Sequence, residues 1–392
     1  MPHAIQTTVS SPIDSLVIVT GANGFIASHT IHNLLLKGHR VLGTVRSEDK
    51  ATVVRKTHAR LTPASAHLLD VAVVPDITAL DAYTSLFAKT EPVAVLHMAA
   101  PFAYTTTNFE QDLLLPAVRG TESVFHAVAQ TPSIRRVVHT NSFACIYDAS
   151  LGPRPGYTYT ASDWCPLKYE DGVNAGSPQV AYRASKAVAE RRGWEFVEKR
   201  SQDGSGCGFD LVSLCPAMVF GPYLPTPHSM PSSSEELNTS NKLVWDVVSA
   251  GQESAVPPTR GPVWIDVRDV AEAHVKALDL DIADRNGEVG GKVRRLLLAK
   301  GVYCSQEIAD LAREVAEADK QMEKYLGRIP VGSPGQRDAA THFGVDASSE
   351  EGELGGKSGW RGLRETLLDL VPQLYAIEGA TAETNGHVGE IE

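Results

Sequence analysis

Residues 16–27 read Leu16-Val-Ile-Val-Thr-Gly21-Ala-Asn-Gly24-Phe-Ile-Ala27, and this stretch decides the fold. An apolar strand candidate runs directly into a glycine turn, and apolar residues then recur at helical spacing as far as Leu35. In this pattern Gly21 permits a tight turn, Gly24 lets the backbone approach a pyrophosphate, and Ala27 keeps the helix near the sheet. The helix N-terminus presents N–H groups and a positive dipole end to the phosphates. The context predicts a dinucleotide-binding turn rather than a βα turn without a ligand, although the spacing is G-x-x-G-x-x-A and not G-x-G-x-x-G.

The second strand candidate, residues 40–46, ends in a cation, Arg46. NAD-binding chains tend to carry Asp or Glu near this point to bind the ribose 2′-hydroxyl, whereas an Arg accommodates the 2′-phosphate of NADP. Ser47 and Lys50 add a hydroxyl and a second cation nearby. The pattern therefore favours NADPH/NADP+ as the cofactor, with a solvated surface arginine as the alternative.

The composition is that of an ordinary globular protein. The chain has 392 residues, of which 43% are hydrophobic and 21% charged, and its net charge is −11. This acidic balance argues against nonspecific binding to nucleic acids or to anionic membranes. The N-terminus lacks the basic and apolar regions of a secretory leader, and no run of about 18 apolar residues predicts a membrane span.

The cysteines are few and scattered. They form no C-x-x-C pair, and their number, five, is odd. This usage predicts reduced thiols in a cytoplasmic protein rather than a disulfide framework. It also matches no zinc site, so we expect no metal. The five are Cys145, Cys165, Cys207, Cys215 and Cys304.

Strand and helix patterns alternate through the first two-thirds of the chain. This order predicts a doubly wound parallel α/β sheet of the Rossmann type, with helices on both faces. The strand candidates are residues 16–20, 40–46, 67–74, 93–97, 136–140 and 210–215. The helix candidates between them are residues 25–37, 78–89, 110–130 and 179–200.

The pattern changes after Pro216, where prolines and serines interrupt the chain. We expect residues 14–215 to form the NADP-binding domain and residues 216–378 to form a smaller, mainly helical substrate lobe, with some segments returning to the first domain. Residues 1–13 and 379–392 are expected to be flexible tails. Helix candidates in the lobe lie near residues 235–250, 269–280, 305–318 and 360–376.

A tyrosine and a lysine are placed one helical turn apart in Tyr182-Arg-Ala-Ser-Lys186. Residues i and i+4 share a helix face, so a phenol and an ammonium can point into the same cleft. Free tyrosine has a pKa of about 10, and a neighbouring cation lowers it, which makes the phenol a usable proton donor near neutral pH. An ordinary surface contact is the alternative reading of this spacing.

Another strand candidate ends in hydroxyl groups, in Val137-Val-His-Thr140-Asn-Ser142. Ligands of open α/β sheets bind at the carboxyl ends of the strands. A serine there can donate a hydrogen bond to a carbonyl oxygen and stabilise developing negative charge. The alternative role for Ser142 is a turn residue or a helix cap. By contrast, His97 is expected to be packed, and Asp266, Arg268 and Asp269 read as a local salt-bridge or capping cluster.

Taken together, these motifs resemble those of the extended short-chain dehydrogenase/reductases, over residues 14–378. Within that group the chain is most similar to fungal NADPH-dependent aldehyde and ketone reductases of the methylglyoxal type, relatives of plant dihydroflavonol reductase. The stretches that carry the resemblance are Thr20–Ala27, Val45–Lys50, Val73–Ile77, Leu96–Phe102, Ala181–Lys186, Cys215–Pro222, Ile265–Ala271 and Ile329–Gly332.

The resemblance implies contacts with the cofactor and the substrate. Lys186 would also hold the nicotinamide ribose hydroxyls, Asp76 and Ile77 would flank the adenine, and Pro216 and Val219 would pack beside the nicotinamide. The residues implied at the cofactor are Thr20, Gly21, Asn23, Gly24, Phe25, Ile26, Arg46, Lys50, Asp76, Ile77, Ala99, Tyr182, Lys186, Pro216 and Val219. Those implied at the substrate are apolar or aromatic, which suits an aryl or alkyl carbonyl compound, with ordinary core packing as the alternative: Phe102, Phe143, Tyr147 and Met218.

The sequence departs from its relatives at identifiable places. The family turn is usually Thr-Ser-Ser, and residues 140–142 are Thr-Asn-Ser, which keep the second serine. Residues 201–208 look like a flexible insertion. Residues 117–121 and 147–148 lack the Asn-Val-x-Gly-Thr and Tyr-Gly patterns that are frequent in sugar-nucleotide epimerases. These differences favour a reductase.

We therefore expect an NADPH-dependent carbonyl reductase that acts on a small-molecule aldehyde or ketone. Ser142 would polarise the carbonyl, NADPH would supply the hydride, and Tyr182, tuned by Lys186, would protonate the alkoxide. The alternatives are a nucleotide-sugar epimerase or dehydratase with bound NAD, and a non-catalytic NADP-sensing regulatory protein. We expect a cytoplasmic monomer or homodimer without nucleic-acid or membrane partners.

Overall fold

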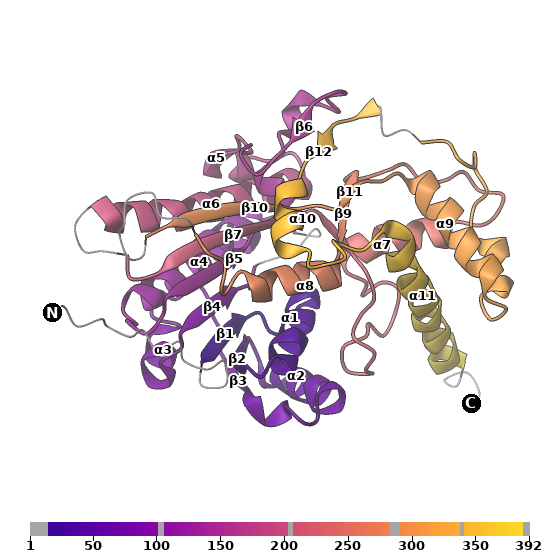
Figure 1. The fold of residues 1–392 in the computed structure, drawn as a ribbon. Helices are drawn as coiled ribbons and strands as arrows, with labels where there is room; N and C mark the ends of the chain where they lie inside the picture. Colours follow the sequence, from indigo (N-terminus) through magenta and orange to yellow (C-terminus); the bar gives the residue numbers. More distant parts are fainter. Residues whose placement is uncertain (1–14, 101–105, 203–206, 283–290, 338–340, 387–392) are drawn as a thin grey trace.

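A seven-stranded parallel sheet forms the centre of the computed structural model, which describes residues 15–100, 106–202, 207–282, 291–337 and 341–386 (Figure 1). Its strand order is β10-β7-β5-β4-β1-β2-β3, and every neighbouring pair is parallel. This confirms the predicted Rossmann-type fold. The strands are β1 (Leu16–Thr20), β2 (Arg40–Val45), β3 (Leu69–Val73), β4 (Ala94–His97), β5 (Arg136–Thr140), β7 (Asp210–Pro216) and β10 (Val293–Leu298).

Alternate residues of each strand enter different cores, as the twofold side-chain period of a strand requires. Val17 and Val19 pack into the core beneath α1, α2 and α8, whereas Ile18 packs into the core beneath α3, α4 and α6. The sheet is therefore buried on both faces. The helices are α1 (Phe25–Leu36), α2 (Glu48–Leu61), α3 (Thr84–Thr90), α4 (Leu115–Ala129), α5 (Tyr169–Val173), α6 (Pro178–Gln202), α7 (Thr239–Val248), α8 (Val267–Lys276), α9 (Ser305–Ala318), α10 (Ser348–Leu354) and α11 (Leu363–Gly386).

The strand order reverses direction at β1, which lies between β4 and β2. In open α/β sheets, ligands bind in the crevice outside the carboxyl ends of the strands at such a switch point. The register sets Thr20 beside His97, and His97 beside His139, so residues from three strands meet at this edge. The topology therefore places the candidate site above β1, β4 and β5.

Strand β10 and helix α2 are among the elements of the main domain that were not predicted from the sequence. Strand β10 carries Arg294 and Arg295 among its apolar residues, which hides its alternation. Helix α2 is largely charged, with only a narrow buried face that includes Ala51 and Val54. Both lie in the expected Rossmann arrangement because tertiary packing, rather than local hydrophobicity, selects them.

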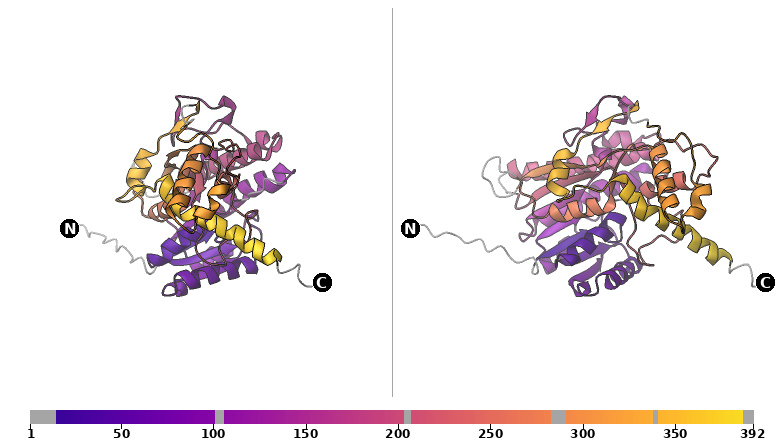
Figure 2. Two further views of the ribbon diagram at one scale, coloured as in Figure 1. Left: turned by 90° about the vertical axis from the view of Figure 1, so that its right-hand side faces the viewer. Right: turned by 45° about the vertical axis from the view of Figure 1, so that its right-hand side comes forward.

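The C-terminal lobe combines helices with a small sheet. Strands β8 (Met218–Phe220), β9 (Val263–Asp266) and β11 (Gly301–Val302) form a three-stranded sheet, and helices α7, α9 and α11 pack around it. Figure 2 shows α11 running along this lobe and projecting from it. The helix continues to Gly386, into the segment from residue 379 for which the sequence predicted a flexible tail.

Other late segments return to the main domain, as expected. Strand β10 joins the main sheet, and helix α10 packs against this strand. Strand β12 (Gly344–Val345) pairs in parallel with β6 (Thr158–Tyr159) (Figure 1). This pairing connects the C-terminal part of the chain to the loop that follows the serine turn. The predicted insertion at residues 201–208 lies partly in α6, while residues 203–206 fall outside the described residues.

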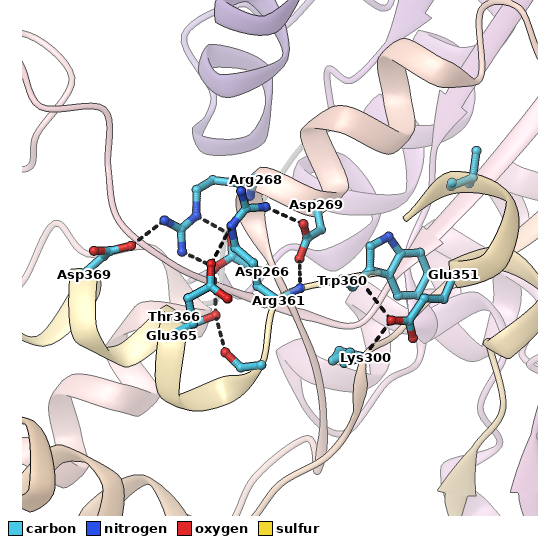
Figure 3. A network of polar contacts seen from close by, with 12 residues as sticks. Asp266, Arg268, Asp269, Lys300, Glu351, Trp360, Arg361, Glu365, Thr366 and Asp369 are labelled. Carbon is cyan, nitrogen blue, oxygen red and sulfur yellow. Dashed lines mark hydrogen bonds and ion pairs between the residues drawn. The ribbon is translucent and has the colours of Figure 1, made fainter. Parts of the chain in front are cut away.

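Asp266 ties the two parts of the chain together (Figure 3). Its carboxylate is buried at the N-cap of α8 and accepts hydrogen bonds from the Arg268 backbone and the Thr366 hydroxyl, both at 2.7 Å. Arg268 pairs with Asp266 at 2.7 Å and also contacts Asp369 on α11. The predicted local cluster is therefore also a connection between α8 and α11.

A second set of contacts runs beside it (Figure 3). Asp269 accepts from the Arg361 backbone at 2.7 Å and from its guanidinium at 2.5 Å. Glu351, on α10, accepts from the Trp360 backbone at 2.9 Å and from Lys300 at 2.6 Å. Helices α8, α10 and α11 are thus held by one continuous polar layer.

We expect Asp266→Ala to lower the free energy of unfolding by about 3–5 kcal/mol, because it leaves Arg268 without its buried partner and α8 without its cap. Asp369→Ala is the matched control, since Asp369 is 51% exposed and its pair with Arg268 should contribute at most about 1 kcal/mol. Urea unfolding followed by circular dichroism measures both changes. Similar losses in the two variants would contradict this assignment.

Candidate active site

The glycine turn has the geometry that close backbone packing requires. Gly21 has φ +67°, and a Cβ at this residue would lie 2.9 Å from the Ala99 Cα. The Gly24 N–H donates to the Gly21 carbonyl at 2.9 Å, which closes the turn. A glycine that the sequence analysis did not single out, Gly43 on β2, matters equally, because its Cβ would lie 2.8 Å from the Ala22 Cβ. Any side chain at Gly21 or Gly43 would displace the turn.

The Thr20 side chain has a structural role, and the contact with the cofactor that the resemblance implied stays a prediction. Its Oγ1 accepts hydrogen bonds from the backbone N–H groups of Met98 and Ala99, both at 3.0 Å. The hydroxyl proton is then left for His97 Nδ1, which lies 2.9 Å away. The hydroxyl therefore holds the end of β4, and Ala99 with it, against the glycine turn.

The N-terminus of α1 fits a pyrophosphate. The N-cap residue, Gly24, makes no side-chain capping bond, and the first helical hydrogen bond runs from Ser28 N to Gly24 O at 2.9 Å. The N–H groups of Phe25, Ile26 and Ala27 consequently have no acceptor within the helix. Asn23, at the tip of the turn, is exposed. An anion bound here would meet N–H donors and the positive end of the helix dipole.

Arg46 and Lys50 form a cationic corner after β2. Arg46 is exposed, and Lys50, in the first turn of α2, is partly buried. Burial, followed by repulsion from Arg46, lowers the pKa of Lys50. Within the described ranges, neither residue forms an ion pair. Two neighbouring cations without an acidic partner suit a phosphate group.

The predicted adenine contacts lie beyond β3. Asp76 is exposed, and its carboxylate accepts from the Thr78 N–H and hydroxyl at 2.8 and 2.6 Å, which lowers its pKa. Ile77 packs against α4 where Gly120 has no side chain, since a Cβ there would lie 3.1 Å from Ile77 Cδ1. Both residues are thus fixed in place, and their contacts with adenine stay a prediction.

Lys186 joins the Tyr182 helix to the serine turn. Both residues lie in the first half of α6, one helical turn apart, and the Lys186 side chain is buried. Its Nζ donates to the Thr140 carbonyl at 3.0 Å, at the carboxyl end of β5. Burial lowers the pKa of Lys186. The structure therefore brings the predicted Tyr182-Lys186 pair to the strand end that leads into Ser142.

Ser142 takes the capping role that was the alternative reading of its position. It is the N-cap of a short 3-10 turn, Phe143–Cys145, and its Oγ accepts from Ala144 N at 3.1 Å. That bond uses a lone pair, so the hydroxyl proton can be donated to a substrate oxygen. Asn141, which differs from the usual family turn, is buried and donates to the Ser213 hydroxyl at 2.8 Å.

The Thr140 side chain binds a histidine that sequence reasoning missed. His274, on α8, has Nδ1 at 2.7 Å from the Val270 carbonyl, so this nitrogen carries the proton. Its Nε2 therefore accepts from Thr140 Oγ1 at 2.8 Å. The rings of His97 and His139 stack with their centroids 5.1 Å apart. Burial, and then Lys186, lowers the pKa of His97, and burial, His97 and Lys186 lower that of His139. These three histidines are neutral near pH 7, and His97 is packed as predicted.

An aromatic wall adjoins the serine turn. Phe143 and Tyr147 stack at 5.7 Å, and Phe343, from the C-terminal part of the chain, lies 5.9 and 5.5 Å from them. Tyr159 completes the cluster at 5.0 Å from Phe343. Phe343 has no signal in the sequence, because only the β6–β12 pairing brings it here.

The remaining predicted cofactor and substrate contacts are buried, partly buried or outside the described residues. Met218 packs with the core of the C-terminal lobe and accepts a contact from Ser240 at 3.7 Å. Pro216, at the end of β7, and Val219, on β8, are both buried. Phe102 lies outside the described residues.

The described residues also bear on metals and membranes. All five cysteines are unpaired and buried. Across the described ranges, no group of three or more His, Cys, Asp and Glu side chains is arranged to hold a metal ion. In the same part of the chain, no helix is both long and apolar enough to cross a membrane.

Comparisons with known proteins agree with this geometry. Residues 17–290 match the model of the NAD dependent epimerase/dehydratase family. The NADPH-dependent methylglyoxal reductase Gre2 of Saccharomyces cerevisiae is 33% identical over 371 residues, covering 93% of this chain and 99% of the relative. The ketoreductase azaE of Aspergillus niger is 33% identical, covering 76% and 81%. The crystal structure of yeast Gre2 with NADPH superposes with a TM-score of 0.78 at 32% identity, over 93% of this chain and 99% of that one.

The buried histidines predict loss of stability in acid. Burial lowers the pKa of His274 to about 4, whereas the unfolded chain takes up this proton near pH 6.5. The stability that neutral His274 contributes is fully present above about pH 6.5 and is lost as the pH falls toward about 4. Between pH 7.5 and 5 this loss lowers the free energy of unfolding by about 2 kcal/mol. In urea titrations over this pH range, we expect the free energy of unfolding of His274→Gln to fall by about 2 kcal/mol less than that of the wild type.

The matched control for this measurement is His67→Gln, at an exposed histidine, which should fall as the wild type does. An equal acid-induced loss in His274→Gln and wild type would contradict the assignment of the proton to His274.

Proposed function

Because this chain belongs to the NAD dependent epimerase/dehydratase family, we propose that it is an NADPH-dependent carbonyl reductase whose reaction is carried out by Ser142, Tyr182 and Lys186. The observation that carries the proposal is the Lys186–Thr140 hydrogen bond, at 3.0 Å. It joins the Tyr182 helix to the serine turn at the sheet edge that also holds the glycine turn. The named relatives over most of the chain are reductases, which agrees with this site.

Ser142 orients and polarises the substrate. Its backbone is fixed by the short turn, and its hydroxyl proton is available to a carbonyl oxygen. A donor placed where negative charge develops stabilises the transition state more than the ground state. Bound NADPH would supply a hydride to the carbonyl carbon.

Tyr182 then provides the proton that completes the alcohol. As charge grows on the substrate oxygen, the phenol donates its proton to that oxygen. Lys186 lies one helical turn from Tyr182 and is held by the Thr140 carbonyl, so its positive charge favours the phenolate that remains. Neutral His97 and His139 beneath it add no competing charge. The protein thereby contributes orientation and a preorganised field.

The cofactor would be held by residues that the structure brings to one edge of the sheet. The α1 N-terminus, with Gly21, Asn23, Gly24, Phe25 and Ile26, suits the pyrophosphate. Arg46 and Lys50 suit the 2′-phosphate, and Asp76 and Ile77 would flank the adenine. Ala99, Pro216 and Val219 would line the path to the nicotinamide, with Lys186 at its ribose.

The substrate would be a small aldehyde or ketone with an alkyl or aryl group. The stacked rings of Phe143 and Tyr147 next to Ser142 support this assignment, because apolar walls with few polar groups suit such compounds. The unpaired cysteines support a cytoplasmic location. A monomer or homodimer is the assembly we propose.

We expect Tyr182→Phe to lower kcat for methylglyoxal by about 10²–10⁴-fold, because the proton donor is lost. NADPH binding, measured by fluorescence titration, should be retained. Tyr325→Phe is the matched control, because Tyr325 stacks on Tyr375 in the C-terminal lobe. Full turnover by Tyr182→Phe would refute the proposed role, and tight NAD retention without turnover of any carbonyl would favour an epimerase.

We expect Arg46→Ala and Lys50→Ala each to raise the KM for NADPH by about 10–100-fold, since a charge-assisted bond contributes about 1.5–3 kcal/mol. The KM for NADH should change little, because NADH lacks the 2′-phosphate. Lys56→Ala, at an exposed lysine of the same helix, is the control. Steady-state kinetics with both cofactors measures these changes in KM. Equal increases in the KM for NADPH and for NADH would contradict the assignment of Arg46 and Lys50 to the 2′-phosphate.

A further inference from the structure

One buried ion pair contacts the segments that surround the proposed active site. Arg295 on β10 and Glu190 on α6 have side chains that are 4% and 0% exposed. They meet in two parallel contacts, Nε to Oε1 and Nη2 to Oε2, both at 2.8 Å. Taking two charges out of water is unfavourable unless their remaining donors and acceptors also find partners. Those partners show what the pair holds in place.

Arg295 binds the serine turn and the loop that follows it. Its Nη2 also donates to the Cys145 carbonyl at 2.8 Å, at the end of the turn that Ser142 begins. Its Nη1 donates to the carbonyls of Ala161, at 2.9 Å, and Asp163. With the two bonds to Glu190, these contacts use all five donors of a guanidinium. The Trp164 ring lies over the same group at 3.7 Å.

Glu190 places one end of the ion pair on α6, the helix of Tyr182 and Lys186. Through Ser213 it also reaches Asn141, the residue before Ser142. It lies one helical turn after Lys186 on α6. Its carboxylate accepts from the Ser213 hydroxyl on β7, and Ser213 Oγ accepts from Asn141 Nδ2 at 2.8 Å. Asn141 directly precedes Ser142, whereas Cys145 follows three residues later. The pair therefore reaches the serine turn from both ends.

We propose that Glu190 and Arg295 are positioning residues, which set Ser142 relative to Tyr182 and Lys186 and hold residues 161–164 beside the substrate site. This inference rests on the proposed reductase function. The physical reason is geometric: α6, β7, β10, the serine turn and the loop meet at one guanidinium–carboxylate contact. A misplacement of about 1 Å at a reacting group can lower a rate about 10²-fold. Lysine cannot replace Arg295, because it has three donors in place of five.

The deciding variant is the double substitution Glu190→Gln/Arg295→Met, which removes both charges and so leaves none buried and unpaired. We expect it to fold and to bind NADPH within about twofold of wild type, because Arg46 and the glycine turn are untouched. The value of kcat for methylglyoxal, per NADPH-binding site, should fall at least tenfold. The same loss is expected for Arg295→Lys. A merely structural role would lower the number of NADPH-binding sites and leave kcat per site unchanged.

Arg294→Lys is the matched control, because Arg294 lies on the same strand and its pair with Glu353 is partly exposed, at 31% and 32%. It should retain wild-type kcat. A double variant with wild-type kcat per site overturns the positioning proposal. Tyr182→Phe, assayed alongside, separates the two hypotheses: if it stays fully active, the proposed function fails, and if it is inactive while the double variant is unaffected, only the positioning inference fails.

Discussion

A buried lysine is the constraint on which the rest of the site depends. The Lys186 ammonium lies at the carboxyl end of β5 with its side chain almost fully enclosed, and a charge in that position needs an acceptor and tolerates no second cation. The Thr140 carbonyl is that acceptor, and its use fixes the distance between α6 and the serine turn. Burial, and after it the same charge, lowers the pKa of the stacked imidazoles of His97 and His139 and keeps them neutral. Burial does so for His274. Burial at this edge of the sheet therefore underlies both the geometry of the proposed site and the acid sensitivity of the fold.

The C-terminal half of the chain completes what the Rossmann half begins. Strand β10 extends the main sheet and supplies Arg295, the β6–β12 pairing brings Phe343 to the serine turn, and α8 supplies His274. The buried carboxylate of Asp266 holds α8 to α11. The division at residue 216 describes the chain order better than it describes the packing, because residues from both sides of it surround the proposed active site.

The sequence was sufficient for elements whose signals are local. It was enough to predict the glycine turn, the cationic end of β2 and the one-turn spacing of Tyr182 and Lys186. Each of these depends on residues within a few positions of one another. Prediction was weaker where a long-range contact selects the structure. Strand β10 was missed because its two arginines break the apolar pattern, and one of them is buried only because Glu190 faces it. The structural role of the Thr20 hydroxyl, which binds the end of β4, had no signal in the sequence.

The sequence by itself determined the fold class and the dinucleotide turn, because backbone periodicity and turn chemistry depend on neighbouring residues, and it led us to propose Ser142, Tyr182 and Lys186 as the catalytic set. Tertiary structure alone decided which groups surround that set. His274, Glu190, Arg295 and Phe343 come from four separate elements, and in the sequence each looks like an ordinary surface or core residue. They meet only because the sheet order and the late returning segments bring them together, and burial then turns their hydrogen bonds and charges into constraints on the active site.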